Sequence, residues 1–143
     1  MSETSGQLYT LGYSGWKLDA LVTKVQDLDA ALMDIRYSPN SRQPQWRMRE
    51  LAAFFGARYV HVPALGNINY RGGAMKISDY AAGRRIAQRY LAEGHNVVLL
   101  CVCAQVAQCH RLYVATRLEE DLGLDPAVHL QPTRPDNRQE RLL

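Results

Sequence analysis

The fold is decided by Val97-Val98-Leu99-Leu100-Cys101-Val102-Cys103-Ala104-Gln105-Val106-Ala107-Gln108-Cys109-His110-Arg111, a stretch that holds all three cysteines of the chain. Its short apolar start is typical of a strand in a parallel sheet that is covered on both faces. A loop follows, and Cys109-His110-Arg111 marks the start of a helix. In open α/β sheets, ligands bind outside the carboxyl ends of the strands, where the next helix presents unpaired N–H groups. This stretch therefore predicts a buried strand with a ligand site at its end.

The rest of the chain alternates between strand-like and helical patterns. Strand-like runs cover Gln7–Leu11, Ala30–Ile35, Arg58–Val62 and Ala127–Leu130, and apolar residues recur at helical spacing over Leu18–Leu28, Trp46–Phe55, Ile77–Leu91 and Cys109–Leu122. Parallel neighbours need crossover connections, so this alternation predicts an α/β fold. We expect a three-layer sandwich with a mainly parallel sheet of about five strands and helices on both faces. The pattern does not fix the strand order.

Length and composition indicate one domain. The 143 residues are 47% hydrophobic, which suits a single α/β domain over residues 1–143 with a real core. The last stretch, from about residue 131, carries two prolines and many charges and predicts a mobile tail.

Charge and cysteine usage narrow the class of protein. Lys+Arg 17 against Asp+Glu 14 gives a net charge of +3, which is far from the dense basic character of a dedicated nucleic-acid binder. No apolar run approaches the roughly 18 residues of a membrane span, and Met1–Gln7 lacks the features of a secretory signal. With an odd, clustered set of thiols, these features predict a reduced cytoplasmic protein without a membrane partner. The oligomeric state and any cofactor stay open.

Three arginines at predicted strand and helix ends indicate an anion. Arg36, Arg42 and Arg111 would form a cationic pocket for a phosphate or carboxylate if they converge above the sheet. Asp34 is a candidate catalytic carboxylate two positions before Arg36, so both side chains point to the same face of the pleat. The alternative is an Asp34–Arg36 structural pair that ties the loop to its neighbour.

Two serines and a tyrosine in turns are further candidates for substrate binding. Ser14 and Ser41 most often cap nearby N–H groups in such turns, and either can add a phosphate contact. Tyr13 precedes Ser14 and belongs to the same candidate set. Five aromatic residues offer faces on which a nucleobase can stack, although most aromatic residues simply pack. They are Tyr59, Tyr70, Tyr80 and the pair Trp46 and Tyr37.

The cysteines and their neighbouring histidine are candidate catalytic groups. Cys109 at a helix start, followed by His110 and Arg111, is placed to favour the thiolate form that nucleophilic or redox chemistry needs. Cys101 ends a buried strand, where a free cysteine often serves only as a small apolar side chain. The eight-residue step between Cys101 and Cys109 also allows a disulfide or sulfenic-acid cycle.

A metal site is disfavoured by the spacing. Structural zinc sites usually take two cysteines two to four residues apart plus a distant second pair, whereas Cys101 and Cys103 are separated by one residue on an extended chain. We therefore predict no metal.

Four motifs resemble those of the domain of unknown function 488 family, over roughly residues 8 to 130. They are a Gly12-Tyr13-Ser14 turn, an Asp-x-Arg-x-x-Pro-x-Ser-Arg loop from Asp34 to Arg42, a Leu65-Gly66 step, and the Leu-Leu-Cys strand followed by Cys-His-Arg. The resemblance implies a Rossmann-like α/β domain with a catalytic pocket, without implying a reaction. Members usually carry an acidic residue two positions after the first cysteine, where this chain has Cys103. If that acid is a general base in the family, its role is missing or moved here.

These observations lead to a functional hypothesis. We expect an enzyme acting on a phosphate-bearing ligand, which is a nucleotide, a nucleic acid or a small phosphorylated molecule, through a Cys-dependent or His-dependent hydrolase or transferase reaction. Two alternatives remain: a non-catalytic nucleotide or nucleic-acid-binding module, and a cysteine-based redox sensor.

Overall fold

The structure, a computed structural model, describes residues 6–103 and 109–132. Its centre is a sheet of five strands in the order β3-β2-β4-β1-β5, and every neighbouring pair is parallel. The strands are β1 (Leu8–Gly12), β2 (Ala30–Asp34), β3 (Tyr59–His61), β4 (Asn96–Cys101) and β5 (Val128–Leu130). The predicted parallel sheet of about five strands is confirmed, and the structure supplies the strand order.

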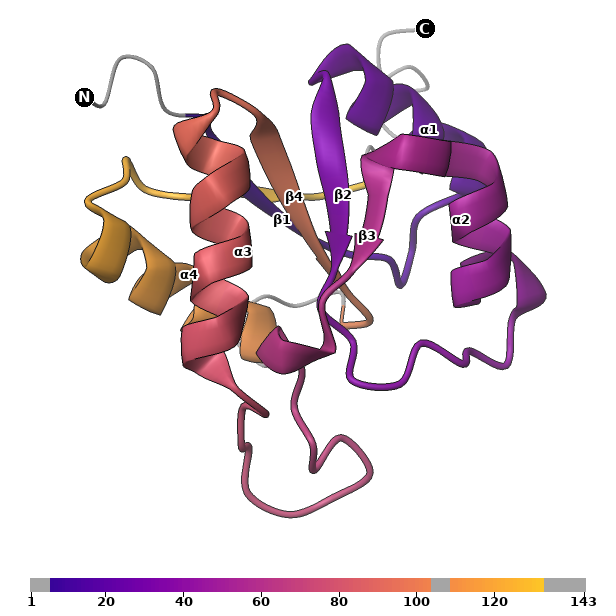
Figure 1. The fold of residues 1–143 in the computed structure, drawn as a ribbon. Helices are drawn as coiled ribbons and strands as arrows, with labels where there is room; N and C mark the ends of the chain where they lie inside the picture. The colour runs from indigo at the N-terminus through magenta and orange to yellow at the C-terminus, as the bar shows by residue number, and fades with distance from the viewer. Residues whose placement is uncertain (1–5, 104–108, 133–143) are drawn as a thin grey trace, which may run out of the picture.

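Helices cover both faces of this sheet (Figure 1). The helices are α1 (Leu18–Asp27), α2 (Met48–Phe55), α3 (Tyr80–Ala92) and α4 (His110–Leu122), with short 3₁₀ turns η2 (Pro44–Trp46), η3 (Gly56–Arg58) and η4 (Pro63–Leu65). Helices α1 and α2 pack on one face of the sheet, and α3 and α4 pack on the other. The fold is therefore a three-layer α/β sandwich of Rossmann-like form, as the alternating pattern predicts.

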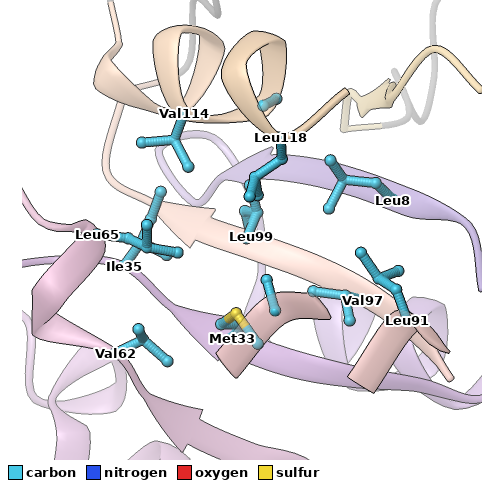
Figure 2. Packing of buried hydrophobic residues seen from close by; sticks show 12 residues of the cluster. Leu8, Met33, Ile35, Val62, Leu65, Leu91, Val97, Leu99, Val114 and Leu118 are labelled. Carbon is cyan, nitrogen blue, oxygen red and sulfur yellow. The ribbon is translucent and has the colours of Figure 1, made fainter. Parts of the chain in front are cut away.

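Side chains of the central strand β4 alternate between two hydrophobic cores. Val97 and Leu99 face α3 and α4, where Leu99 lies among Met33, Val114 and Leu118 (Figure 2). The intervening residues of β4 point to the other core, beneath α1 and α2. Burying one such side chain stabilises the fold by about 1.5–3 kcal/mol, so burial on both faces explains why β4 reads as an unbroken apolar run.

The chain leaves the two neighbouring strands β2 and β4 in opposite directions. After β2 it runs to α2 on one face, and after β4 it runs to α4 on the other. Asp34 at the end of β2 stands opposite Leu100 of β4, so these two exits lie side by side. Adjacent strands whose connections diverge in this way form a topological switch point, where α/β sheets bind their ligands. The topology thus places the site outside the carboxyl ends of β2 and β4.

Two element boundaries differ from the sequence pattern. The helix predicted from Trp46 is interrupted, because Arg47 is extended (φ −77°, ψ 152°) between η2 and α2. The helix predicted from Ile77 begins at Tyr80, after Asp79 caps it by accepting a hydrogen bond from the N–H of Ala82 at 3.2 Å. The tail predicted from about residue 131 lies almost entirely outside the described residues.

Candidate functional site

A cavity of about 410 Å³ opens at the switch point. Its walls come from the residues that follow β2, the loop after η4, the end of β4 and the start of α4. Among the described residues they are Arg36, Tyr37, Ser38, Asn67, Tyr70, Cys101, Val102, Cys103 and His110. The cavity therefore unites one of the predicted arginines with two of the cysteines and the histidine.

A buried ion pair forms the floor beside β2. Asp34 is 0% exposed and Arg36 is 5% exposed, and the guanidinium donates from Nε to Asp34 Oδ1 at 2.8 Å and from Nη2 to Oδ2 at 2.6 Å. The hydroxyl of Tyr59 donates to the same carboxylate at 2.6 Å. Burial raises the pKa of Tyr59, and the neighbouring Asp34 charge raises it further. The structure thus contains the Asp34–Arg36 pair that the sequence offered as the structural alternative to catalysis by Asp34.

The Arg36 guanidinium keeps part of its donor capacity. Its Nη1 is buried and has no hydrogen-bond partner within the described part of the chain. Burial opposes the charge of Arg36, but the hydrogen bond and Coulomb attraction from Asp34 outweigh it and raise the pKa of Arg36. The guanidinium also lies 5.3 Å from the ring centroid of Tyr13, which in turn stacks on Trp46. Because an unsatisfied buried donor costs about 1–3 kcal/mol, an oxygen placed at Nη1 would be stabilising.

His110, the first residue of α4, contacts one of the thiols that line the cavity. His110 Nε2 lies 3.0 Å from the carbonyl oxygen of Ile35. Since a carbonyl oxygen only accepts, Nε2 carries the proton and Nδ1 faces the Sγ of Cys101 at 3.4 Å. Cys101, a candidate nucleophile, thus contacts His110, a candidate base, and the carbonyl of Ile35 orients the His110 ring.

The three thiols share one electrostatic environment. Hydrogen bonds to Cys103 and Cys109, together with burial, raise the pKa of Cys101. The hydrogen bond from Cys101 lowers the pKa of Cys109 to about 3, against burial and with help from His110 and the backbone N–H of Arg111. Cys109 occupies the N-cap position of α4, as the sequence predicts, and is 6% exposed. A negative charge in this cluster therefore resides preferentially on Cys109, and Cys101 keeps its proton.

The same cluster brings three metal-binding atoms together. The sulfurs of Cys101 and Cys109 and a ring nitrogen of His110 all lie within 4.8 Å of one another. The sequence spacing disfavours a metal at the neighbouring pair Cys101 and Cys103, whereas the fold brings together a different donor set, Cys101, Cys109 and His110.

Arg111 is not among the described residues that line the cavity. It is 0% exposed, and its Nε donates to the hydroxyl of Thr10 at 3.2 Å while Nη1 donates to the carbonyl of Cys103. A Cβ added at Gly12 would stand 1.5 Å from that carbonyl oxygen and 2.4 Å from Arg111 Nη1. Arg111 therefore fixes the end of β4 against β1, and only glycine fits at position 12.

Arg42, Ser41 and Ser14, which the sequence also predicts to bind the ligand, are not among the described residues that line the cavity. Arg42 is exposed, and the hydroxyl of Ser41 accepts a hydrogen bond from the N–H of Gln43 at 3.1 Å. The backbone N–H of Ser14 donates to Val102 at 3.0 Å, so this turn pairs with the strand end. Arg36, Arg42 and Arg111 consequently do not line one pocket together. Their predicted roles as substrate contacts stay predictions.

Three polar contributions to the site were not predicted from the sequence. Tyr59, expected only as an aromatic face, donates a hydrogen bond to Asp34, and Ser38 and Asn67 line the cavity. Ser38 and Asn67 lie in aperiodic loops that give no signal of their direction. The Leu65-Gly66 step was the available clue, because a Cβ at Gly66 would stand 2.7 Å from the Cα of Tyr37 and so mark where the two loops meet.

The fold and the site define an α/β domain with a cysteine–histidine cavity at its topological switch point. The family model described as domain of unknown function DUF488 matches residues 19–118. The chain belongs to this family, as its four motifs indicate. No curated protein matches this sequence. Within residues 6–103 and 109–132, every helix is too short or too polar to cross a membrane.

Proposed function

We propose that this protein is a cysteine-dependent enzyme that acts on a phosphate-bearing ligand in the cavity at the ends of β2 and β4. The observation that carries the proposal is that Arg36, whose buried Nη1 has no partner among residues 6–103 and 109–132, lines the same cavity as the Cys101–His110 pair. A guanidinium recognises phosphate oxygens, and a thiol beside a histidine performs nucleophilic chemistry. A ligand held by Arg36 in this cavity would have its reactive part near the thiols.

The reacting thiol in this proposal is Cys101. Cys101 is among the described residues that line the cavity, whereas Cys109, at the N-cap of α4, is not. Hydrogen bonds and burial raise the pKa of Cys101, so its thiol is protonated before reaction. During the reaction His110 Nδ1, 3.4 Å from Sγ, accepts this proton, and the resulting thiolate attacks an electrophilic atom of the ligand. The leaving group departs with a proton returned by His110. Water or a second substrate then cleaves the adduct, which corresponds to a hydrolase or a transferase respectively.

The aromatic rim favours a nucleotide as the phosphate-bearing ligand. Tyr37 and Tyr70 line the cavity, are 41% and 48% exposed, and have ring centroids 6.3 Å apart. Exposed aromatic faces next to a phosphate-binding guanidinium suit a base and its phosphate.

Isothermal titration with inorganic phosphate and with adenosine monophosphate tests this proposal. Arg36→Lys keeps a cation beside Asp34 but removes the spare donor, so affinity should fall about 10- to 100-fold, the worth of one charge-assisted hydrogen bond. Arg42→Ala is the matched control and should leave affinity within about twofold, since Arg42 is exposed and outside the described lining. Intact-mass analysis with phosphorylated substrates should show an adduct that Cys101→Ser lacks. Absence of both phosphate binding and adduct formation would refute the proposal.

A thiol-based redox sensor is the second candidate, favoured by the sulfurs of Cys101 and Cys109 lying within 4.8 Å of each other. Peroxide would oxidise the Cys109 thiolate to a sulfenic acid, and Cys101 would displace water to form a disulfide. Peptide mass analysis after peroxide distinguishes this candidate, because it requires a Cys101–Cys109 disulfide that reductant reverses.

A further inference from the structure

We propose that Cys101, Cys109 and His110 bind one Zn²⁺ ion, with its fourth coordination position open to the cavity. The inference goes beyond the proposed function and does not depend on it. It rests on the convergence of two sulfurs and one imidazole nitrogen within 4.8 Å of one another. Two thiolates and one imidazole, with one open position, form a known zinc donor set.

The distance between two of these donors already fits tetrahedral coordination. Zinc binds thiolate sulfur at about 2.3 Å and imidazole nitrogen at about 2.05 Å, so a tetrahedral angle separates the two ligand atoms by about 3.6 Å. The Sγ of Cys101 lies 3.4 Å from Nδ1 of His110. An ion therefore needs only small shifts of these two side chains.

His110 makes the hydrogen bond that is typical of a histidine that binds a metal. Such a residue usually donates its other ring N–H to a carbonyl or carboxylate, which fixes the ring and leaves the ligating nitrogen bare. His110 donates from Nε2 to the carbonyl of Ile35 at 3.0 Å, which turns Nδ1 toward the sulfurs.

The open position follows from the cavity walls. Cys101 and His110 line the cavity, so an ion between them and Cys109 faces its interior. Cys103 also lines the cavity but is not one of the three converging donors. Zinc at this site would occupy the thiols as ligands, so metal loading and thiol nucleophilicity are alternative states of one cluster.

Cobalt titration of the reduced, chelator-treated protein tests the site, with Co²⁺ as the spectroscopic probe and Zn²⁺ as competitor. We expect one equivalent of Co²⁺ to give thiolate-to-metal charge-transfer absorption and tetrahedral visible bands, both abolished by one equivalent of Zn²⁺. Cys109→Ser should weaken binding more than about 100-fold, beyond the 10- to 100-fold cost of losing an outer partner. Cys103→Ser is the matched control and should bind within about threefold of wild type. Binding that survives Cys109→Ser, or that Cys103→Ser abolishes equally, overturns the assignment.

A measurement on the unmodified protein guards against a folding defect in the variants. Zn²⁺ should protect Cys101 and Cys109 from alkylation by iodoacetamide, as read by peptide mass analysis. Unchanged alkylation in the presence of a molar excess of Zn²⁺ overturns the inference. Phosphate binding and adduct formation measured without metal remain as the separate test of the proposed function.

Discussion

The buried Asp34–Arg36 pair should be strongly coupled to folding, and a double-mutant cycle measures the coupling. Arg36→Met leaves the Asp34 carboxylate, 0% exposed, with only the Tyr59 hydroxyl and a backbone N–H. Removing one partner of a buried pair costs about 3–5 kcal/mol, because the remaining charge is desolvated without compensation. We expect that loss for Arg36→Met and for Asp34→Leu in urea unfolding at neutral pH.

The double variant should recover most of the stability that each single variant loses. Asp34→Leu with Arg36→Met removes both charges and should cost about 1–2 kcal/mol, chiefly because Tyr59 loses its acceptor. The interaction energy is then at least about 4 kcal/mol in the wild-type protein.

An exposed ion pair in the same protein is the control for this cycle. Arg58 and Asp29 lie 2.7 Å apart but are 39% and 86% exposed. Their cycle, made with Asp29→Asn because Asp29 has a positive φ of 50°, should give an interaction energy below about 1 kcal/mol. Equal interaction energies for the two pairs would refute the claim that burial strengthens the coupling between Asp34 and Arg36.

Three further predictions concern the cavity and its cluster. Tyr70→Ala should weaken adenosine monophosphate binding by the worth of one stacked base, about 1–3 kcal/mol, and leave phosphate affinity unchanged in the same titrations. Gly66→Ala should lower the free energy of unfolding by about 1–3 kcal/mol and weaken both ligands, because the new Cβ displaces Tyr37; Gly123→Ala, with open space around it, should not affect binding. Thiolate absorbance should persist at about pH 6, where an ordinary thiol of pKa about 8.5 is protonated, because the hydrogen bond from Cys101 lowers the pKa of Cys109 to about 3. Cys101→Ala should shift that titration upward, and an unshifted curve would show that Cys101 does not stabilise the thiolate.

The alternating pattern predicted the layers of the fold because each strand and helix carries its own periodicity. Val97 to Leu100 read as a doubly buried strand and is one. The strand order was not accessible, because it depends on which face each crossover takes. That choice is made by packing between residues far apart in the chain, such as Leu99 with Val114.

The sequence pattern indicates the sheet edge at which the cavity opens, but it identifies only some of the residues that line the cavity. Cys109 was placed correctly at a helix start, because a strand, a loop and a helix are local features. Arg36, Arg42 and Arg111 do not line one cavity among the described residues. The sequence could not show this, because a guanidinium can turn toward either side of the sheet edge. Arg111 turns down to Thr10, and Arg36 is directed by Asp34 and Tyr13. These directions are set by tertiary neighbours that the sequence pattern does not identify.

The most direct test of the central claim is whether an anion bound at Arg36 shields the thiol at Cys101. The rate of Cys101 alkylation by iodoacetamide is measured with and without saturating phosphate, in wild type and in Arg36→Lys. If the guanidinium and the thiol serve one cavity, phosphate slows the reaction in wild type and has little effect in Arg36→Lys. A wild-type rate that phosphate leaves unchanged, at a concentration where titration shows the anion to be bound, would contradict a shared active site.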